Sequence, residues 1–400
     1  MKIGFLISEY PGQTHSFFWR EMSALKRLYN VDFQVIGTRP NAQPAKHSWL
    51  AQAPADYLYP IPPAQWPALL AALPGAVFKA LRHRDCATQL KHPRGWAALL
   101  MAVRLKQRCQ KHGIDHVHVH SLANSALIAA LCKQVYGQPY SITLHGPLRY
   151  FGPDQPLKWE AAEFATVITE TLRREVTKKL PQVADKISIA PMGVDTEYFA
   201  PTDPTPVRQD GAFQWFSCGR LVPGKGFDTI IRAARRLRED NPDRTFDIRI
   251  AGEDSKDGQG FRLELQSEID AAGLSEVITL LGSLPQESIR TELEKAQGFV
   301  LISNEEALGV AYMEAMACGL PTIGARTGGV GELIADGQDG YLVPPRDDAT
   351  LAWIMLRIMT DPDLCTALAQ SAREKVLNHF SSDRSAQAIA KALNLTKNPH

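Results

Sequence analysis

Short runs of apolar residues alternate along most of the chain with longer stretches whose apolar positions recur at helical spacing. In the first half, the apolar runs of strand length are Lys2–Ser8, Val31–Thr38, Asp115–His120, Tyr140–Gly146, Thr166–Glu170 and Ile187–Gly193. Stretches of helical period lie between several of them, for example Ser16–Leu28, Ala123–Tyr136 and Thr171–Leu180. Continuous apolar strands that alternate with helices are typical of a parallel sheet covered on both faces.

A second series of the same kind follows Ala200–Gly211, a segment rich in proline and polar residues that we interpret as a linker. Its strand-length runs are Phe213–Leu221, Thr245–Glu253, Val277–Gly282, Gly298–Ser303, Pro321–Ala325 and Gly340–Val343. The stretch Phe227–Leu237 has a clean helical stripe, and after Asp347 the pattern is helical to about Leu395.

The alternation predicts an α/β protein with two doubly wound, Rossmann-like domains, at residues 1–200 and 201–380. Residues 381–400 are expected to form a helix that packs back on the first domain. Two such domains place a cleft between the carboxyl ends of their sheets, and ligands bind there.

Composition narrows the class of protein. The 400 residues include 44 lysines and arginines and 43 aspartates and glutamates, which excludes a nucleic-acid binder coated in positive charge. The six cysteines form no C-x-x-C pair, so we expect a reducing compartment and no disulfide framework. Glu9 and Pro11 end the first apolar run before a secretory leader could form, and prolines interrupt Ala64–Leu81, so we expect a cytoplasmic protein without a membrane span.

The stretch Phe299–Gly319 carries the strongest chemical signal. An apolar strand ends at Ser303, a polar loop contains Glu306, and a helix begins near Gly309. The N-terminus of a helix offers unpaired N–H groups and positive potential, which suit a diphosphate. The residues that would offer these groups are Leu308, Gly309, Val310 and Ala311.

Glu306 and Glu314 are eight positions apart, one in the loop and one in the second turn of the helix. Carboxylates so placed can accept hydroxyl hydrogen bonds on either side of a phosphate at the helix start, one from a transferred group and one from a ribose. The alternative is a solvated charge at Glu306 and a helix-surface glutamate at Glu314.

In Phe213–Phe227, a strand leads into a glycine-containing loop with Arg220 and Lys225, and a helix follows. Two cations at the carboxyl end of a strand would neutralise a pyrophosphate, including charge that develops on a leaving group. The loop lacks the Walker A spacing. The alternative is that both are solvated loop cations.

Together with Gly328-Gly329, Glu332 and the run DGQDGYLVPPRD at Asp336–Asp347, these stretches resemble the retaining GT-B glycosyltransferases of family 4. That family carries G-R-L-x-x-x-K-G after a strand, an E-x7-E pair, G-G-x-x-E, and D-G-x-x-G-x-L-V-P. All four occur here in the family's order, between about Phe213 and Asp348.

The first half resembles the family more loosely. The loop SEYPGQTHSFFWREMSAL is similar to that of bacterial exopolysaccharide glycosyltransferases such as those of colanic acid assembly, but Thr14–Phe17 departs from their usual P-x-x-S-E-T-F run. ITLHG at Ile142–Gly146 resembles the family's strand that ends in His-Gly. ISIAPMGVD at Ile187–Asp195 resembles its inter-domain signature.

The resemblance implies a role for each matching residue of the second half. Arg220 and Lys225 would bind the diphosphate of a UDP-, GDP- or ADP-sugar donor. Glu306 would contact the donor sugar hydroxyls and Glu314 the ribose. The backbone of Leu308–Ala311 would support the phosphate and the sugar.

The resemblance also implies that His145 lies near the reacting carbon and Gly12 close to the donor phosphates. The acceptor would be a saccharide or a lipid-linked saccharide. In such retaining enzymes the leaving phosphate is thought to assist deprotonation of the acceptor hydroxyl, so no protein nucleophile is expected.

A metal site is conceivable where His116, His118 and His120 share one face of a predicted strand, with His112 nearby. Hydrogen-bonded histidines are the preferred interpretation, with His120 at the end of the strand. Asp361-Pro362-Asp363 falls in a turn between predicted helices. We therefore predict transfer without a metal or another cofactor.

The region Lys79–Lys111 contains nine cations against one acid, Asp85, and it follows the apolar, aromatic run Tyr57–Phe78. This combination favours contact with an anionic membrane surface, and a lipid-linked acceptor would be presented there. The alternative is a solvated basic face.

Three other functions stay open. A nucleotide-sugar epimerase of GT-B architecture is disfavoured by the Arg220, Lys225, Glu306 and Glu314 set. A nicotinamide-dependent oxidoreductase should carry G-x-G-x-x-G in its first βα turn, where only Gly12 occurs. A non-catalytic protein that binds nucleotide sugars would bind without turnover.

Overall fold

The computed structural model describes residues 1–400 except 13–14, 43–46, 202–210, 255–257 and 398–400. The chain divides into two compact units, of which the first is Met1–Pro191 with Asp383–His400 and the second is Met192–Ser382. Most of the linker predicted at Ala200–Gly211 lies outside the described residues, as does Thr14.

The first unit is built on a seven-stranded sheet in the order β3-β2-β1-β4-β5-β6-β7, and every strand pair is parallel. The strands are β1 Lys2–Tyr10, β2 Asp32–Pro40, β3 Ala55–Tyr57, β4 His116–Val119, β5 Tyr140–Leu144, β6 Ala165–Val167 and β7 Ile187–Ile189. In register, Phe5 of β1 lies between Val35 of β2 and His118 of β4. The strand β3 was not predicted, because its three half-buried residues form no apolar run.

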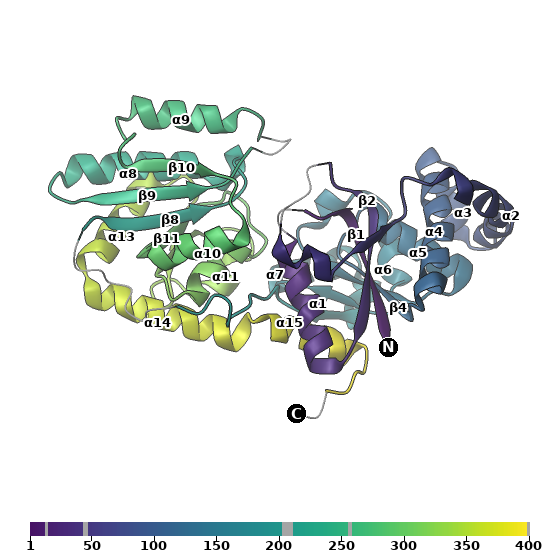
Figure 1. Ribbon diagram of the computed structural model, residues 1–400. Coiled ribbons are helices and arrows are strands. Elements are labelled where there is room, and N and C mark those ends of the chain that lie inside the picture. The colour runs from purple at the N-terminus through teal and green to yellow at the C-terminus, as the bar shows by residue number, and fades with distance from the viewer. Residues whose placement is uncertain (13–14, 43–46, 202–210, 255–257, 398–400) are drawn as a thin grey trace. The chain divides into compact units, whose positions relative to one another are not determined.

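Helices cover both faces of this sheet (Figure 1). The helices of this unit are α1 Ser16–Tyr29, α2 Trp66–Leu81, α3 Arg84–Gln89, α4 Pro93–His112, α5 Asn124–Tyr136, α6 Gln155–Glu160, α7 Glu170–Lys179 and α15 Ser382–Ala392, with short 3₁₀ turns η1 Ser48–Gln52, η2 Pro63–Gln65, η3 Leu148–Phe151 and η4 Pro181–Lys186. Of these, α2 and α3 lie outside the layer on the sheet and pack against α4. Thr169 caps α7 by accepting the N–H of Leu172. Within the described residues, no helix is long and apolar enough to cross a bilayer.

The second unit contains a six-stranded parallel sheet in the order β10-β9-β8-β11-β12-β13. Its strands are β8 Phe213–Cys218, β9 Phe246–Ala251, β10 Ile278–Gly282, β11 Gly298–Leu301, β12 Thr322–Ala325 and β13 Tyr341–Val343. Its helices are α8 Phe227–Asp240, α9 Phe261–Ala271, α10 Gln286–Lys295, α11 Val310–Ala317, α12 Val330–Leu333, α13 Asp348–Thr360 and α14 Pro362–His379, with the 3₁₀ turn η5 Pro223–Lys225.

The prediction of two doubly wound parallel sheets is confirmed. Several predicted strands end earlier than expected at their carboxyl ends. The strand predicted at Tyr140–Gly146 ends at Leu144, and the strand predicted at Gly298–Ser303 ends at Leu301. Residues beyond these ends leave the ladder and form the loops in which the chemical signals lie.

The last helix completes the core of the first unit. Ala386, Ile389 and Ala390 of α15 are buried in one cluster with β1 and α1 residues such as Phe5 and Met22. Each is essentially inaccessible to solvent. Burial of apolar surface contributes about 25 cal/mol per Å² to the free energy of folding. The helix α15 therefore stabilises the first unit, although the other residues of that unit lie far earlier in the chain.

We predict that Ile389→Ala lowers the free energy of unfolding of the first unit by about 2–5 kcal/mol, because it leaves a cavity in this core. Urea titration followed by tryptophan fluorescence measures the change. Lys391→Ala, on the exposed side of the same helix, is the control and should change stability little. Equal losses in both variants would contradict the packing of α15.

Candidate functional site

The strand order of the second unit reverses between β8 and β11, which are neighbours in the sheet. The helices that follow these two strands, α8 and α11, connect them to strands on opposite sides, β9 and β12. In open α/β sheets, ligands bind at such a switch point. The predicted residues Arg220, Lys225 and Glu306 all lie in the loops that follow β8 and β11.

These two loops are in direct contact. The backbone N–H of Asn304 donates to the carbonyl of Gly224 at 2.8 Å. Gly226, at φ +72°, lies so close to the second loop that a Cβ there would be 1.8 Å from the carbonyl oxygen of Ile302. A glycine is therefore required after Lys225, and it fixes where the lysine leaves the backbone.

Lys225 and Glu306 form an ion pair across the two loops. The lysine Nζ lies 2.5 Å from Oε2 of Glu306, and about a sixth of each side chain is exposed (18% and 17%). Ser303 also faces Oε2, with its Oγ at 3.4 Å. The structure thus brings together two predicted residues that are far apart in sequence, in a partly desolvated, charge-assisted contact.

The loop after β12 holds the backbone of the Glu306 segment. Gly329 donates its N–H to the carbonyl of Glu306 at 3.2 Å, and Thr327 Oγ1 donates to the carbonyl of Ser303 at 3.1 Å. Gly328, at φ +51°, would place a Cβ 1.9 Å from the Glu306 carbonyl oxygen. This contact is a physical reason for the Gly328-Gly329 pair.

The helix α11 begins immediately after this loop. Gly309 is its N-cap at φ +95°, and no side chain caps the helix. The N-terminal N–H groups therefore face the same loops, with Leu308 buried and Val310 and Ala311 half-buried. Tyr312 ties the first turn to the sheet by donating its hydroxyl to the carbonyl of Leu301 at 2.6 Å.

Glu314 lies in the interior and is 9% exposed, so the alternative of a helix-surface glutamate is wrong. Burial, and after it the negative charge of Glu314, raises the pKa of the Cys218 thiol at the end of β8. Arg220 is exposed, and no group in the described part of the chain bonds to it.

Asn304 is a residue that the sequence reasoning missed. Its side-chain oxygen is buried and has no hydrogen-bond partner among the described residues. Unsatisfied buried polar atoms are uncommon in folded proteins, and each calls for a physical explanation. The asparagine directly precedes Glu305-Glu306, but its amide carried no motif of its own.

The first unit has a switch point of its own, between β1 and β4. Gly12 follows β1 and donates its N–H to Nδ1 of His15 at 2.9 Å. His145 follows β5, and its Nε2 lies 3.1 Å from Nδ1 of His120. Burial lowers the pKa of both His120 and His145 to about 3, so both rings are neutral at neutral pH.

The histidines of β4 are hydrogen-bonded, as the sequence interpretation preferred. His116 pairs with Ser141 Oγ at 2.7 Å. The ligand atoms of Glu21, His118 and His120 lie within 4.8 Å of one another, a spacing that a metal ion could use. Both ring nitrogens of His118, however, are already engaged by Ser141 and Thr143, at 2.7 and 2.8 Å. His112 lies elsewhere and contacts Asp56.

Two parts of the chain match models of known protein families. Residues 57–198 match the family described as Glycosyltransferase Family 4, and residues 204–375 match the one described as Glycosyl transferases group 1. The chain belongs to the GT-B glycosyltransferases of family 4. The resemblance to GT-B glycosyltransferases of family 4 is thereby confirmed, whereas retention of configuration and the exopolysaccharide type stay predictions.

Among curated relatives, this glycosyltransferase is 26% identical to N-acetyl-alpha-D-glucosaminyl L-malate synthase of Bacillus anthracis, over 72% of this chain and 76% of that enzyme. It is also 26% identical to the GDP-mannose-dependent alpha-(1-6)-phosphatidylinositol monomannoside mannosyltransferase of Mycolicibacterium smegmatis, over 70% of this chain and 76% of that one. Anabaena HepE, solved in complex with UDP, shares the fold with a TM-score of 0.75 at 20% identity, over 98% of this chain and 100% of that one.

We predict that Gly328→Ala destabilises the second unit more than Gly337→Ala does. Both glycines have positive φ, but a Cβ at Gly337 meets nothing within 4 Å, whereas one at Gly328 collides with the Glu306 backbone. The left-handed conformation alone costs an L residue about 1–2 kcal/mol, and the collision adds to that at Gly328 only. Urea unfolding of both variants measures the difference, and equal losses would contradict the contact.

Proposed function

We propose that this glycosyltransferase moves a sugar from a nucleoside diphosphate sugar to a saccharide or lipid-linked saccharide, with retention of anomeric configuration, in polysaccharide or glycolipid synthesis. The observation that carries the proposal is the Lys225–Glu306 pair at the switch point of the second unit, beside the uncapped start of α11. A cation, a carboxylate and a helix N-terminus are what a sugar diphosphate needs for binding.

In this proposal, Lys225 changes its partner when the donor binds. Without a donor, Glu306 neutralises Lys225. A diphosphate carries more negative charge than one carboxylate and would take over the ammonium group, together with Arg220. The oxygens of Glu306 would then be free to accept hydrogen bonds from the sugar hydroxyls, while the buried carboxylate of Glu314 accepts from the ribose.

The chemical step breaks the bond between the anomeric carbon and the leaving phosphate oxygen and forms a bond from the same carbon to the acceptor oxygen, on the same face. The hydroxyl proton of the acceptor goes to the leaving phosphate. Negative charge grows on the diphosphate in the transition state, and Arg220, Lys225 and the dipole of α11 stabilise it there. In this proposal, protein groups supply the positive charge, and the enzyme needs no metal.

A thermal-shift screen of UDP-, GDP- and ADP-sugars is the first test of this proposal. A ligand that binds only the folded state raises the melting temperature of the protein. The nucleotide sugar so identified is incubated with saccharide and lipid-linked acceptors, and NMR of the product gives its anomeric configuration. A product with inverted configuration, or an epimerised donor without transfer, would contradict the proposal.

Two variants separate binding from chemistry at the ion pair. Lys225→Met should weaken binding of the free nucleoside diphosphate and lower kcat by about 10²–10³-fold, as the loss of one preorganised charge does. Glu306→Gln should lower kcat as well but bind the free diphosphate at least as tightly as the wild type, because Lys225 is no longer neutralised.

Isothermal titration with the diphosphate and steady-state kinetics measure the two effects. Lys295→Met, at a lysine on α10 paired with Glu292, is the matched control and should leave both unchanged. Loss of diphosphate affinity in Glu306→Gln equal to that in Lys225→Met would count against the exchange of partners at Lys225.

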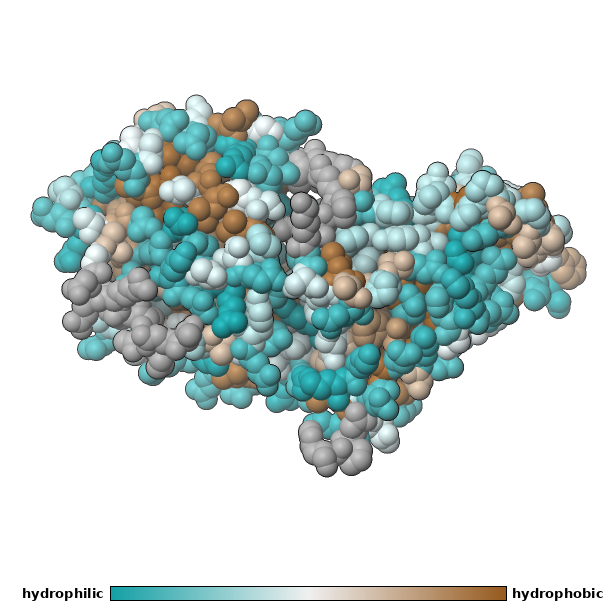
Figure 2. All heavy atoms as spheres, viewed as in Figure 1, coloured by the Kyte–Doolittle hydropathy of each residue, from teal (hydrophilic) through white to brown (hydrophobic). Residues whose placement is uncertain are grey.

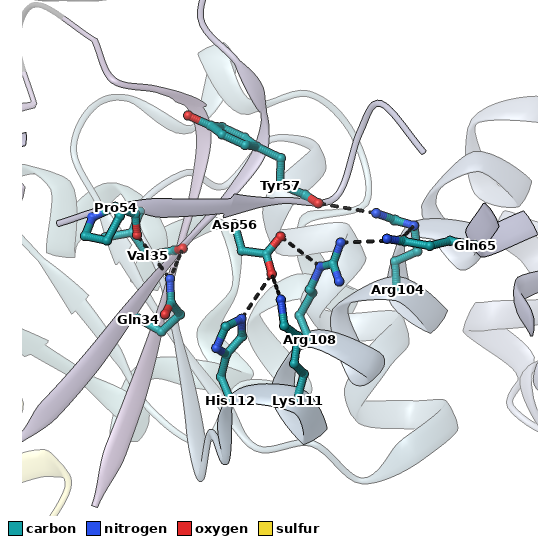
Figure 3. A network of polar contacts seen from close by, with 10 residues as sticks. All are labelled: Gln34, Val35, Pro54, Asp56, Tyr57, Gln65, Arg104, Arg108, Lys111 and His112. Atoms are coloured by element: carbon teal, nitrogen blue, oxygen red, sulfur yellow. Dashed lines mark hydrogen bonds and ion pairs between the residues drawn. The ribbon is translucent and has the colours of Figure 1, made fainter. Parts of the chain in front are cut away.

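We also propose that the first unit docks on an anionic membrane, but through a smaller set of cations than the sequence indicated. Arg104 is 1% exposed and donates to Gln65 and to the carbonyl of Tyr57. Arg108 and Lys111 contact Asp56 of β3, each at 3.1 Å (Figure 3). These cations hold α4 against β3, whereas Lys79, Arg82, Arg84 and Lys91 are exposed.

The exposed cations accompany an apolar stripe on α2. Trp66, Leu70, Phe78 and Leu81 fall on one side of the helix and are 40–66% exposed. The opposite side is buried through residues such as Leu69 and Ala80. Figure 2 shows apolar surface over the α2 and α3 region. An exposed apolar stripe bordered by cations is typical of a helix that lies in the interface of an anionic bilayer.

Co-sedimentation with phosphatidylglycerol vesicles at low salt tests this docking. Arg82→Gln/Arg84→Gln should weaken binding roughly 30-fold, since each cation near an anionic surface contributes about 1 kcal/mol. Phe78→Ser/Leu81→Ser should weaken it as well. Lys178→Gln/Lys391→Gln, which removes two exposed cations elsewhere in the first unit, is the control. Absence of wild-type binding, or an equal loss in the control, would contradict membrane docking.

A further inference from the structure

A line of polar side chains crosses the interior of the first unit and ends at His145. Ser385 of α15 donates its hydroxyl to Oε2 of Glu21 at 2.6 Å. Oε1 of Glu21 lies 3.3 Å from Nε2 of His120, and Nδ1 of His120 lies 3.1 Å from Nε2 of His145. The line joins α15, α1 and the ends of β4 and β5.

Aromatic rings seal this line from water. The ring of His120 stacks on Phe5 and Phe18, with centroids 5.6 and 4.2 Å apart. Glu21 is 6% exposed and Ser385 is 2% exposed. Histidines beside the line add no positive charge at neutral pH, because burial holds the pKa of His118 well below its usual range and lowers that of His15 to about 4. In this setting, hydrogen bonds rather than solvent determine where each ring proton lies.

Either ring can donate in the His120–His145 hydrogen bond, and the carboxyl group beside His120 favours one direction. Two neutral histidines carry one ring proton each. Oε1 of Glu21 and Nε2 of His120 lie within ion-pair distance at 3.3 Å, and neither atom has a hydrogen-bond partner among the described residues. Burial raises the pKa of Glu21, while the neighbouring His118 and the Ser385 hydroxyl lower it. A negative charge at Glu21 favours the tautomer of His120 that carries its proton on Nε2 and presents a lone pair at Nδ1. His145 must then donate from Nε2, which leaves Nδ1 of His145 without a proton.

No described residue donates a hydrogen bond to this nitrogen. Nδ1 of His145 is buried and has no hydrogen-bond partner among the described residues, although the residue as a whole is only half-buried. A buried acceptor without a donor costs about 1–3 kcal/mol of desolvation. Its position directly beyond the carboxyl end of β5 is where a ligand would supply the missing donor.

We propose that Glu21 and His120 are positioning residues that fix the tautomer and rotation of His145, so that Nδ1 accepts a hydrogen bond from a hydroxyl of the sugar substrate. This inference rests on the proposed function, which supplies the sugar. It assigns a task to Glu21, a carboxylate that the transfer chemistry does not otherwise use.

The test is ¹⁵N NMR of the full chain with ¹⁵N-labelled histidine, in which His145→Asn identifies the signals of His145. The wild type should show the proton of His145 on Nε2. Glu21→Met, and independently His120→Phe, which keeps the aromatic stack, should give a mixture of tautomers at His145. We expect kcat to fall about 10- to 100-fold in both, as when an orienting partner of a functional histidine is removed, while affinity for the nucleoside diphosphate stays unchanged.

His116→Asn is the matched control, because it removes another buried histidine hydrogen bond on β4 outside the line. It should leave the tautomer of His145 as in the wild type. A wild-type proton on Nδ1, or an unaltered tautomer and kcat in both Glu21→Met and His120→Phe, would overturn the inference. If the wild type transfers no sugar at all, the proposed function fails, whereas the NMR result still decides whether Glu21 and His120 position the ring.

Discussion

The close approach of the loops after β8 and β11 is the constraint on which the candidate donor site depends. At Gly226 the two backbones leave no room for a side chain, and the hydrogen bond from Asn304 to Gly224 fixes their register. Only at this separation can Lys225 and Glu306 meet at 2.5 Å without a long, flexible reach. The glycines of the loops after β8 and β12 therefore determine where the charged side chains lie. Without a side chain at Gly226 or Gly328, the loop backbones can approach closely enough to hold Lys225 beside Glu306.

Much of this arrangement was predictable from the sequence, for a simple reason. The strands of a buried parallel sheet are continuous apolar runs, and stretches with helical periodicity separate them in the sequence. The strand β3 escaped prediction because Ala55–Tyr57 lies at the sheet edge and is only half-buried. In the candidate site, Lys225 and Glu306 belonged to motifs, but Asn304 did not, because its burial depends on the neighbouring loop rather than on its own surroundings in sequence.

Two charged residues show where periodicity succeeds and fails. Glu21 falls on the buried stripe of α1, between Phe18 and Leu25, so a carboxylate on an apolar stripe was a signal that the sequence offered. Arg104 lies off the apolar stripe of α4, yet it is buried because Gln65 and the Tyr57 carbonyl cover it. The periodicity of a helix predicts which face packs on the sheet. It does not predict that another segment of the chain, here the one with Tyr57 and Gln65, covers a different face.

The burial of α15 in the core of the first unit has a consequence for biosynthesis. Ile389 and its neighbours pack against β1 and α1, which leave the ribosome hundreds of residues earlier. Domains generally fold as units during translation, from the N-terminus onward. The apolar surface of β1 and α1 is therefore fully covered only after α15, at Ser382–Ala392, has been synthesised. A chain that terminates before α15 would present that surface to chaperones and proteases.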